Sequence, residues 1–365
     1  MEGDDRFMLS PATSLPRIWI GLWQLSSNAW GSAPAPKVRD AMATHMGKGF
    51  FAFDMVRYVS SSQRSYRPLT ATTPADHYGP AEDLFGSFVA GLPADTNPRP
   101  FGATKWCIFH PTEITYEKVA AAVKERSDRM QKDRVDLLQF FWQDYQDRNY
   151  ITALQHLARL RMAGKIRNLG LCNFDTKRTE EVCVELGRGY IVSNQVAFSI
   201  IDVRPLHGMN DLCDRYGFKV LAYGTLCGGL LTDRWLGKPE PELYSGQLNP
   251  SQRKYLDVIL KAWGDWDLFQ NLLRLLRDIG DRHGGVSIAN VAIRWVLEHH
   301  FVGAVLIGAR LGLSDNTEDN AKVFTFSLTY RDKADIEAVL KLSRSNTMIM
   351  TIGDCGAEYR QKEEY

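Results

Sequence analysis

The chain has 365 residues, 44% of them hydrophobic, which is enough to bury the core of one large α/β domain or of two smaller ones. Lys and Arg number 44 and Asp and Glu 43, so the formal net charge is +1 and the basic excess of a nucleic-acid-binding protein is missing. No run approaches the roughly 18 apolar residues of a membrane span, and the acidic N-terminus lacks the apolar core of a signal peptide. We therefore expect neither a nucleic-acid partner nor a membrane association.

Eight short apolar runs alternate with longer segments of helical period. This alternation is typical of repeated strand–helix units around a parallel sheet. The expected strands lie near residues 17–21, 50–54, 101–105, 135–141, 166–173, 190–195, 218–223 and 304–308.

Two helix starts between these strands are clear. Thr115 begins one helix, and Ser287 begins another whose apolar face includes Val291 and Trp295. Eight units in a chain of this length favour a closed (β/α)8 TIM barrel over a two-domain, doubly wound sheet. We predict one barrel domain over residues 1–365, with a C-terminal tail at 346–365 and a long loop at about 224–263, after the seventh strand.

Polar side chains occur at the carboxyl ends of the predicted strands. In a barrel all of these ends open on one face, where active sites are built. Six polar residues in register therefore predict a single site, and they are Asp54, Lys105, Asn173, Gln195, Tyr223 and Arg310.

The cysteines are scattered along the chain, without a CxxC pair or a His–Cys spacing suited to zinc. We expect no metal site and a reduced, cytoplasmic protein. The six are Cys107, Cys172, Cys183, Cys213, Cys227 and Cys355.

Several segments together resemble the aldo-keto reductase family over roughly residues 16–350. They include Phe-Asp at 53–54, Ala-Asp-His-Tyr-Gly-Pro-Ala-Glu at 75–82, Ala-Thr-Lys at 103–105, the run from Asp136 to Tyr145, Asn-Leu-Gly-Leu-Cys-Asn at 168–173 and Ile-Gly-Ala-Arg at 307–310. The resemblance implies hydride transfer from NADPH to a carbonyl carbon by an Asp-Tyr-Lys-His tetrad.

The tetrad maps onto Asp54, Tyr78, Lys105 and Phe141. Tyr78 would donate the proton, and the Lys105 ammonium would lower the cost of the phenolate, since a phenol with a pKa of about 10 is otherwise a weak acid. Phe141 stands where the family has histidine and supplies no hydrogen-bond donor. The loss of one such donor typically lowers the rate by about 10²–10³-fold. The nearest alternative donor in the sequence is His110.

The cofactor site also follows from the resemblance. A GxGxxG motif of a Rossmann site is missing after the first predicted strand. Asn173 and Gln195, next to Cys172, would hold the nicotinamide carboxamide, and Tyr223 would stack on the ring. Arg310 would bind the 2′-phosphate of NADP, because its planar fork suits phosphate. The remaining expected cofactor contacts are Trp23, Asp54, Leu226, Gly308, Asn316, Asp319 and Asn320.

A small-molecule substrate is expected, with a pocket lined by Trp23, Tyr78, Trp106, Phe141 and Trp142. These aromatics suggest an aromatic or apolar substrate. We expect an NADP-dependent oxidoreductase that reduces a carbonyl or a conjugated alkene. The alternatives are a non-redox biosynthetic enzyme and an NADP-binding regulatory protein on the same fold. The sequence leaves the oligomeric state open.

An insert at residues 55–74 separates the tetrad Asp from the Tyr, which are five positions apart in the family and 24 apart here. Deleting residues 56–74 restores the run FDMADHYGPAE. The insert is either a real loop that forms a lid beside the site or a retained intron. If the loop is real, Tyr58 is a possible but poor substitute for Tyr78 as the proton donor. Sequencing of the transcript distinguishes the two, because a message that lacks these codons removes the lid hypothesis.

Overall fold

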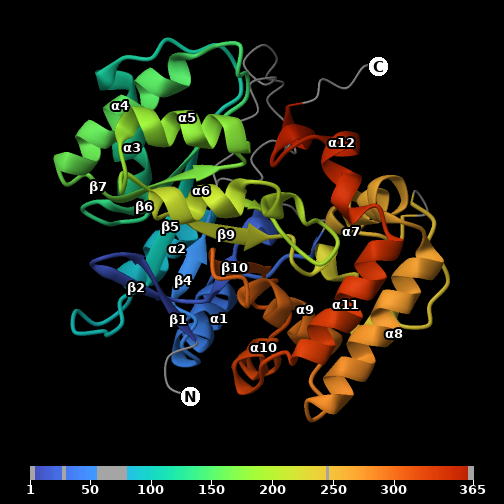
Figure 1. Cartoon of the computed structure of the whole chain (residues 1–365). Helices are drawn as coiled ribbons and strands as arrows, with labels where there is room; N and C mark the ends of the chain where they lie inside the picture. Colours follow the sequence, from blue (N-terminus) through green and yellow to red (C-terminus); the bar gives the residue numbers. More distant parts are fainter. Residues whose placement is uncertain (1–4, 27–29, 56–79, 244–245, 361–365) are drawn as a thin grey trace.

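A computed structural model describes residues 5–26, 30–55, 80–243 and 246–360 (Figure 1). Eight parallel strands form a closed barrel in the order β10-β3-β4-β5-β6-β7-β8-β9. All eight expected strands are confirmed, as is the TIM barrel. The strands are β3 Ile18–Gly21, β4 Ala52–Asp54, β5 Phe101–Ile108, β6 Val135–Trp142, β7 Ile166–Cys172, β8 Ile191–Ala197, β9 Lys219–Tyr223 and β10 Val302–Gly308.

The strands are buried on both faces, which explains why their sequences are continuous apolar runs. Alternate side chains form two separate cores. Leu137 of β6 belongs to the inner core with Trp19 and Leu221, whereas Leu138 and Phe140 belong to the outer core between sheet and helices. Residues in step with Leu137 therefore point to the barrel interior, a rule that also places Gln139 and Phe141 there.

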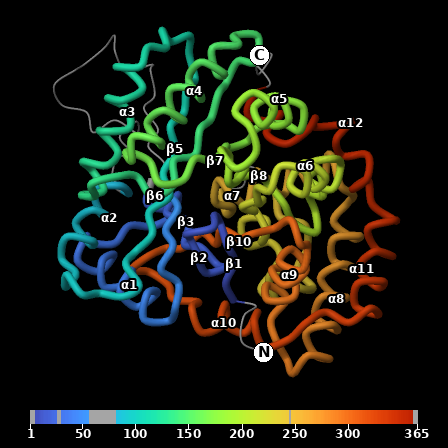
Figure 2. The backbone as a smooth tube through the Cα atoms, turned by 60° about the vertical axis from the view of Figure 1, so that its left-hand side comes forward, coloured from blue at the N-terminus to red at the C-terminus, as the bar shows by residue number. Residues whose placement is uncertain are grey.

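Helices surround the barrel (Figures 1 and 2). The predicted starts are confirmed, because Thr115 accepts a hydrogen bond from the Lys118 amide at 3.3 Å and Ser287 accepts one from the Asn290 amide at 3.2 Å. The helices are α1 Ala35–Gly47, α2 Pro80–Ala90, α3 Tyr116–Arg129, α4 Asn149–Met162, α5 Thr176–Leu186, α6 Met209–Tyr216, α7 Pro250–Val258, α8 Trp266–Arg282, α9 Ile288–Leu297, α10 Thr317–Ala321, α11 Tyr330–Leu342 and α12 Met348–Ile352.

A hairpin that the sequence did not predict covers the amino end of the barrel. It consists of β1 Arg6–Ser10 and β2 Thr13–Pro16. Arg167, at the start of β7, donates to the carbonyl of Ala12 at 2.7 Å, and Leu9 and Leu15 join the inner core. The hairpin thus closes the end of the barrel opposite the predicted site.

The long connection after β9 is confirmed, and it contains α7 and a π-helical turn, Ile259–Trp263. The helix α12 lies toward the other pole of the barrel from the hairpin, above β1 in Figures 1 and 2. In the described part of the chain, no helix combines the length and apolar character needed to cross a membrane.

Two glycines give a matched test of the packing. A Cβ on Gly86 of α2 would lie 2.1 Å from the carbonyl oxygen of Arg129, which is backbone and cannot move aside, whereas one on Gly47 of α1 meets nothing within 4 Å. We expect Gly86→Ala to lower the free energy of unfolding by about 1–3 kcal/mol. Gly47→Ala should be neutral or raise it by about 0.5–1 kcal/mol. Urea denaturation measures both, and equal effects would contradict the close approach of α2 to α3.

Candidate active site

Asp54 is the centre of a hydrogen-bonded network at the carboxyl end of the barrel. Its Oδ2 accepts from Lys105 Nζ at 2.6 Å. Its Oδ1 accepts from Gln139 Nε2 at 2.7 Å and from Gln195 Nε2 at 2.8 Å, and Gln195 Nε2 also lies 2.9 Å from Gln139 Oε1. Four strands, β4, β5, β6 and β8, each contribute one of these side chains. The structure thus brings together three predicted site residues, and it adds Gln139.

The network keeps Lys105 charged. The side chains of Lys105 and Asp54 are only 9% and 10% exposed, and Lys105 also donates to the carbonyl of Met55 at 3.1 Å. Burial acts to lower the pKa of Lys105, but the charge and hydrogen bond of Asp54 outweigh it, and the pKa rises above its usual value. Lys105 is therefore a fixed cation at the site and not a source of protons at neutral pH.

Phe141 faces the same interior but is covered. Its side chain is 4% exposed, with the Phe109 ring 5.3 Å away and the guanidinium of Arg360 5.0 Å from its ring centroid. His110, the alternative donor, is exposed. Its neighbour Phe109 is the residue of this loop that packs on Phe141. A cation from residue 360 therefore lies against the ring of Phe141.

Asn173 and Tyr223 form a second pair, beside the first. The hydroxyl of Tyr223 donates to Asn173 Oδ1 at 2.9 Å. Asn173 has a φ of 55°, a left-handed conformation that is uncommon outside glycine and is concentrated at functional sites. Burial raises the pKa of Tyr223 well above its usual value, so this hydroxyl remains a neutral donor.

The C-terminal segment (residues 353–360) extends over this pair. A Cβ on Gly356 would lie 2.2 Å from the carbonyl oxygen of Asn173, so only glycine allows this approach. The Tyr359 hydroxyl lies 3.2 Å from that of Tyr223 and accepts from Lys254, of α7. The predicted tail thus supplies side chains to the site, which the sequence did not indicate.

A buried ion-pair network anchors the C-terminal segment. Arg204 is fully buried and donates to Asp202 at 2.7 Å and to Glu358 at 2.9 Å, and its Nη1 also reaches the carbonyl of Asp354 at 3.1 Å. Asp354 in turn accepts from the amide of Thr176, at the start of α5, at 2.7 Å. The segment is therefore fixed to the barrel by charged and capping interactions on both sides of Gly356.

The predicted substrate aromatics lie in different places. Trp106 and Trp142 are buried in the outer core, where Trp106 packs on Phe140 at 5.4 Å and Trp142 donates to the carbonyl of Asp144 at 2.7 Å. Trp23 follows β3 and is 37% exposed. Only Trp23 of these three thus presents its ring to solvent at the carboxyl end of the barrel.

The residues expected at the far end of the dinucleotide lie after β10. Arg310 and Asn316 are exposed, Asp319 accepts from Ser287 Oγ at 2.8 Å, and Asn320 is buried. Leu226 is packed against the outer core.

Gly308, at the end of β10, lies against Gln24. A Cβ there would lie 1.9 Å from Gln24 Nε2, and Gln24 Oε1 is buried without a hydrogen-bond partner in the described part of the chain. Buried acceptors are nearly always paired, so a hydroxyl of a bound dinucleotide would satisfy an acceptor that is otherwise unpaired.

Tyr78, the expected proton donor, and nearly all of the insert lie outside the described residues. Among the residues that are described, no cluster of three His, Cys, Asp or Glu side chains could hold a metal ion.

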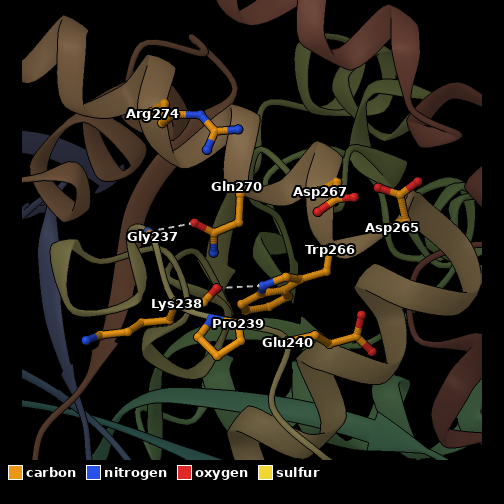
Figure 3. Close-up of a pocket in the computed structure, with 9 residues that line it drawn as sticks. All are labelled: Gly237, Lys238, Pro239, Glu240, Asp265, Trp266, Asp267, Gln270 and Arg274. Carbon is orange, nitrogen blue, oxygen red and sulfur yellow. Dashed lines mark hydrogen bonds between the residues drawn. The ribbon is translucent and has the colours of Figure 1, made fainter.

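A cavity of about 540 Å³ lies apart from these residues, between the loop at 237–240 and the start of α8 (Figure 3). Trp266 Nε1 donates to the carbonyl of Lys238 at 2.9 Å, and the Gly237 amide donates to Gln270 at 2.7 Å. The cavity contains none of the predicted site residues, so it has no part in the proposed chemistry.

The family model for aldo/keto reductases matches residues 17–341. The chain belongs to the aldo/keto reductase family. Members of this family are oxidoreductases that generally use NAD(P)H, and the barrel of this aldo-keto reductase has the fold of solved relatives.

Similar proteins span several functions. Flagellar radial spoke protein 5 of Chlamydomonas reinhardtii is 32% identical over 181 residues, which cover 45% of this aldo-keto reductase and only 33% of that protein. The glycerol dehydrogenase of Gluconobacter oxydans has a TM-score of 0.70 at 20% identity, with 96% and 97% of the two chains covered. An aldo/keto reductase from Klebsiella pneumoniae, solved with NADP and acetate, has a TM-score of 0.63 at 17% identity, with 92% and 95% covered.

The buried ion pair gives a stability prediction. Lys105→Met leaves the Asp54 carboxylate buried without its cation, and we expect a loss of about 3–5 kcal/mol in the free energy of unfolding. The double variant with Asp54→Asn should recover part of that loss, because the uncompensated charge is gone. The control is Lys124→Met, which breaks a pair of the same 2.6 Å length whose side chains are 73% and 60% exposed; this change should cost at most about 0.5 kcal/mol. Strict additivity in the double-mutant cycle would contradict the coupling.

Proposed function

We propose that this chain is an NADPH-dependent carbonyl reductase acting on a small aromatic or apolar molecule. The observation that supports it is the juxtaposition of the Asp54–Lys105 pair with the Asn173–Tyr223 pair at the carboxyl end of the barrel. Family membership gives the reaction class. The resemblance assigns Asp54 and Lys105 to proton transfer, and it assigns Asn173 and Tyr223 to the nicotinamide.

The residues present fit the cofactor. Asn173 and Tyr223 would hold the nicotinamide end, with Cys172 beside them. Arg310 is the exposed cation at the end of β10, suited to a phosphate, and Gln24 supplies a buried acceptor for a hydroxyl of the dinucleotide. Bound NADPH supplies the hydride that is added to the carbonyl carbon.

The side chain of Gln195 takes part in the network around Asp54. Its Nε2 is engaged by Asp54 and Gln139, so its amide group supports the ion pair in this arrangement. We assign Gln195 and Gln139 to positioning Asp54, and we leave the carboxamide contact to Asn173.

The proton for the carbonyl oxygen comes, in this proposal, from Tyr78. A phenol is too weak an acid for the task unless its phenolate is stabilised, and a lysine that remains charged supplies that stabilisation. Asp54 contributes by raising the pKa of Lys105 against the effect of burial. With Phe141 in place of a donor, the chain has one hydrogen bond fewer for the carbonyl oxygen than the family tetrad provides.

The first test is turnover. We expect the protein to bind NADPH and to oxidise it with aldehydes, quinones or enones, and Tyr78→Phe or Lys105→Met to lower kcat/KM by about 10²–10⁴-fold. Lys124→Met is the control and should retain full activity. NADPH binding without oxidation would contradict the reductase and support a regulatory protein, whereas product formation without net NADPH oxidation would support a non-redox enzyme.

The second test concerns residue 141. Phe141→His adds a donor at the carbonyl oxygen, and we expect aldehyde reduction to increase by up to about 10²-fold in kcat/KM. Phe141→Leu changes the ring without adding a donor and serves as the control. If the leucine variant gains as much as the histidine variant, the gain comes from space in the pocket and the donor explanation is wrong.

A further inference from the structure

Arg360 is a cation from the far end of the chain that reaches into the candidate active site. Its Nη1 donates to the carbonyls of Asn173 at 2.6 Å and Gly356 at 2.9 Å, and its Nη2 donates to the carbonyl of Trp142 at 2.9 Å. The guanidinium lies 5.0 Å from the ring centroid of Phe141 and 4.0 Å from that of Tyr145. Arg360 thus connects the carboxyl end of β6, which carries Phe141, to the carboxyl end of β7.

Asp175 and Glu358 act on the charge of Arg360 only from beyond ion-pair distance. All its hydrogen-bond partners are neutral carbonyls, and within the described ranges it forms no ion pair with a carboxylate. Arg204, which anchors the same segment, has two carboxylate partners, Asp202 and Glu358. Burial lowers the pKa of Arg360, whereas for Arg204 the carboxylates outweigh burial and raise the pKa.

Arg360 also has unused donors. A guanidinium has five N–H groups, and the three hydrogen bonds use both on Nη1 and one on Nη2. Nε is buried and has no partner among the residues that the structure describes. Nε and Nη2 share one edge of the guanidinium, the kind of edge that binds the two oxygens of a carboxylate.

The position of this cation relates it to the catalytic network. Cys172 ends β7, and burial raises the pKa of its thiol to about 12 although both Lys105 and Arg360 act to lower it. Both cations are therefore near Cys172, on the side of the barrel where Asp54 is the carboxylate of the network. Asp54 pairs directly with Lys105, whereas Asp175 and Glu358 act on Arg360 without forming an ion pair with it in the described part of the chain, so Arg360 is left to pair directly with a substrate anion.

We propose that Arg360 binds a carboxylate of the substrate, so that the preferred substrates are aromatic aldehydes or ketones that carry a carboxylate group. This inference rests on the proposed carbonyl reductase and names its substrate class. Arg360 acts here as a specificity residue: it holds the anionic end of the molecule while the carbonyl group lies toward Lys105. Phe141 and Tyr145, stacked on the guanidinium, keep the fork in place.

The test compares an acid with its ester. The full chain is assayed with NADPH and either 4-carboxybenzaldehyde or its methyl ester, and we expect the wild type to prefer the acid in kcat/KM. Arg360→Gln should lower kcat/KM for the acid by about 10- to 100-fold more than for the ester, because a charged hydrogen bond to the substrate is lost only with the acid. Arg360→Lys keeps the charge without the planar fork and should retain part of the preference.

The matched control is Arg344→Gln. Arg344 also donates through its side chain to main-chain carbonyls, those of Leu260 and Gly264 at 3.1 Å, but it lies outside the network described above. We expect this variant to keep the wild-type ratio of acid to ester. A wild type without preference for the acid would overturn the proposal, as would an Arg360→Gln variant that loses activity on both substrates equally, the result expected of a purely structural latch.

A binding measurement separates this inference from the proposed function. Titration calorimetry with benzoate and with benzamide needs no turnover: the wild type should bind benzoate more tightly, and Arg360→Gln should lose that difference. If no aldehyde is reduced but the benzoate preference depends on Arg360, the carboxylate site stands and the reductase proposal fails. Equal binding of benzoate and benzamide by the wild type would overturn the carboxylate site itself.

Discussion

A single buried carboxylate, Asp54, sets the arrangement of the active end of the barrel. Lys105, Gln139 and Gln195 all donate to it, each from a different strand, so the site assembles only when β4, β5, β6 and β8 are all in place. A buried carboxylate is costly unless each of its oxygens is hydrogen-bonded and its charge is paired. Both conditions are met at Asp54, and this is why the lysine beside it remains a cation in spite of its own burial.

The sequence predicted the barrel well because the determinants of a parallel barrel are local. Apolar runs in a regular alternation with helices specify buried strands, and polar residues at the ends of those runs specify the face on which a site is built. Asp54, Lys105, Asn173 and Tyr223 were placed in this way. The residue that was overlooked on the same grounds is Gln139: a polar side chain in step with Leu137, within an otherwise apolar strand, is the pattern of an inward-facing network residue.

Two further features were not predicted from the sequence, for a different reason. The β1–β2 hairpin and the C-terminal segment contact parts of the chain far away in sequence, and neither carries a periodic pattern that predicts where it docks. The roles of Gly356 and Arg360 depend on their contacts with the carbonyl of Asn173, which the sequence does not reveal. From the sequence, Phe141 meant only that a hydrogen-bond donor was lost. The structure shows in addition that the guanidinium of Arg360 lies against the Phe141 ring. Reading the site strand by strand therefore misses what the chain end adds.

Closure of the barrel joins its first and last strands, with Ile18 paired to Val305. A growing polypeptide therefore exposes the edge of β3 until almost the entire chain has left the ribosome, since the strand that covers this edge is made last. Unpaired edges of this kind are prone to pair with other chains, and contacts between remote parts of a sequence form slowly. We therefore expect folding during synthesis to depend on chaperones that cover the open edge of β3, even if the folded protein is stable.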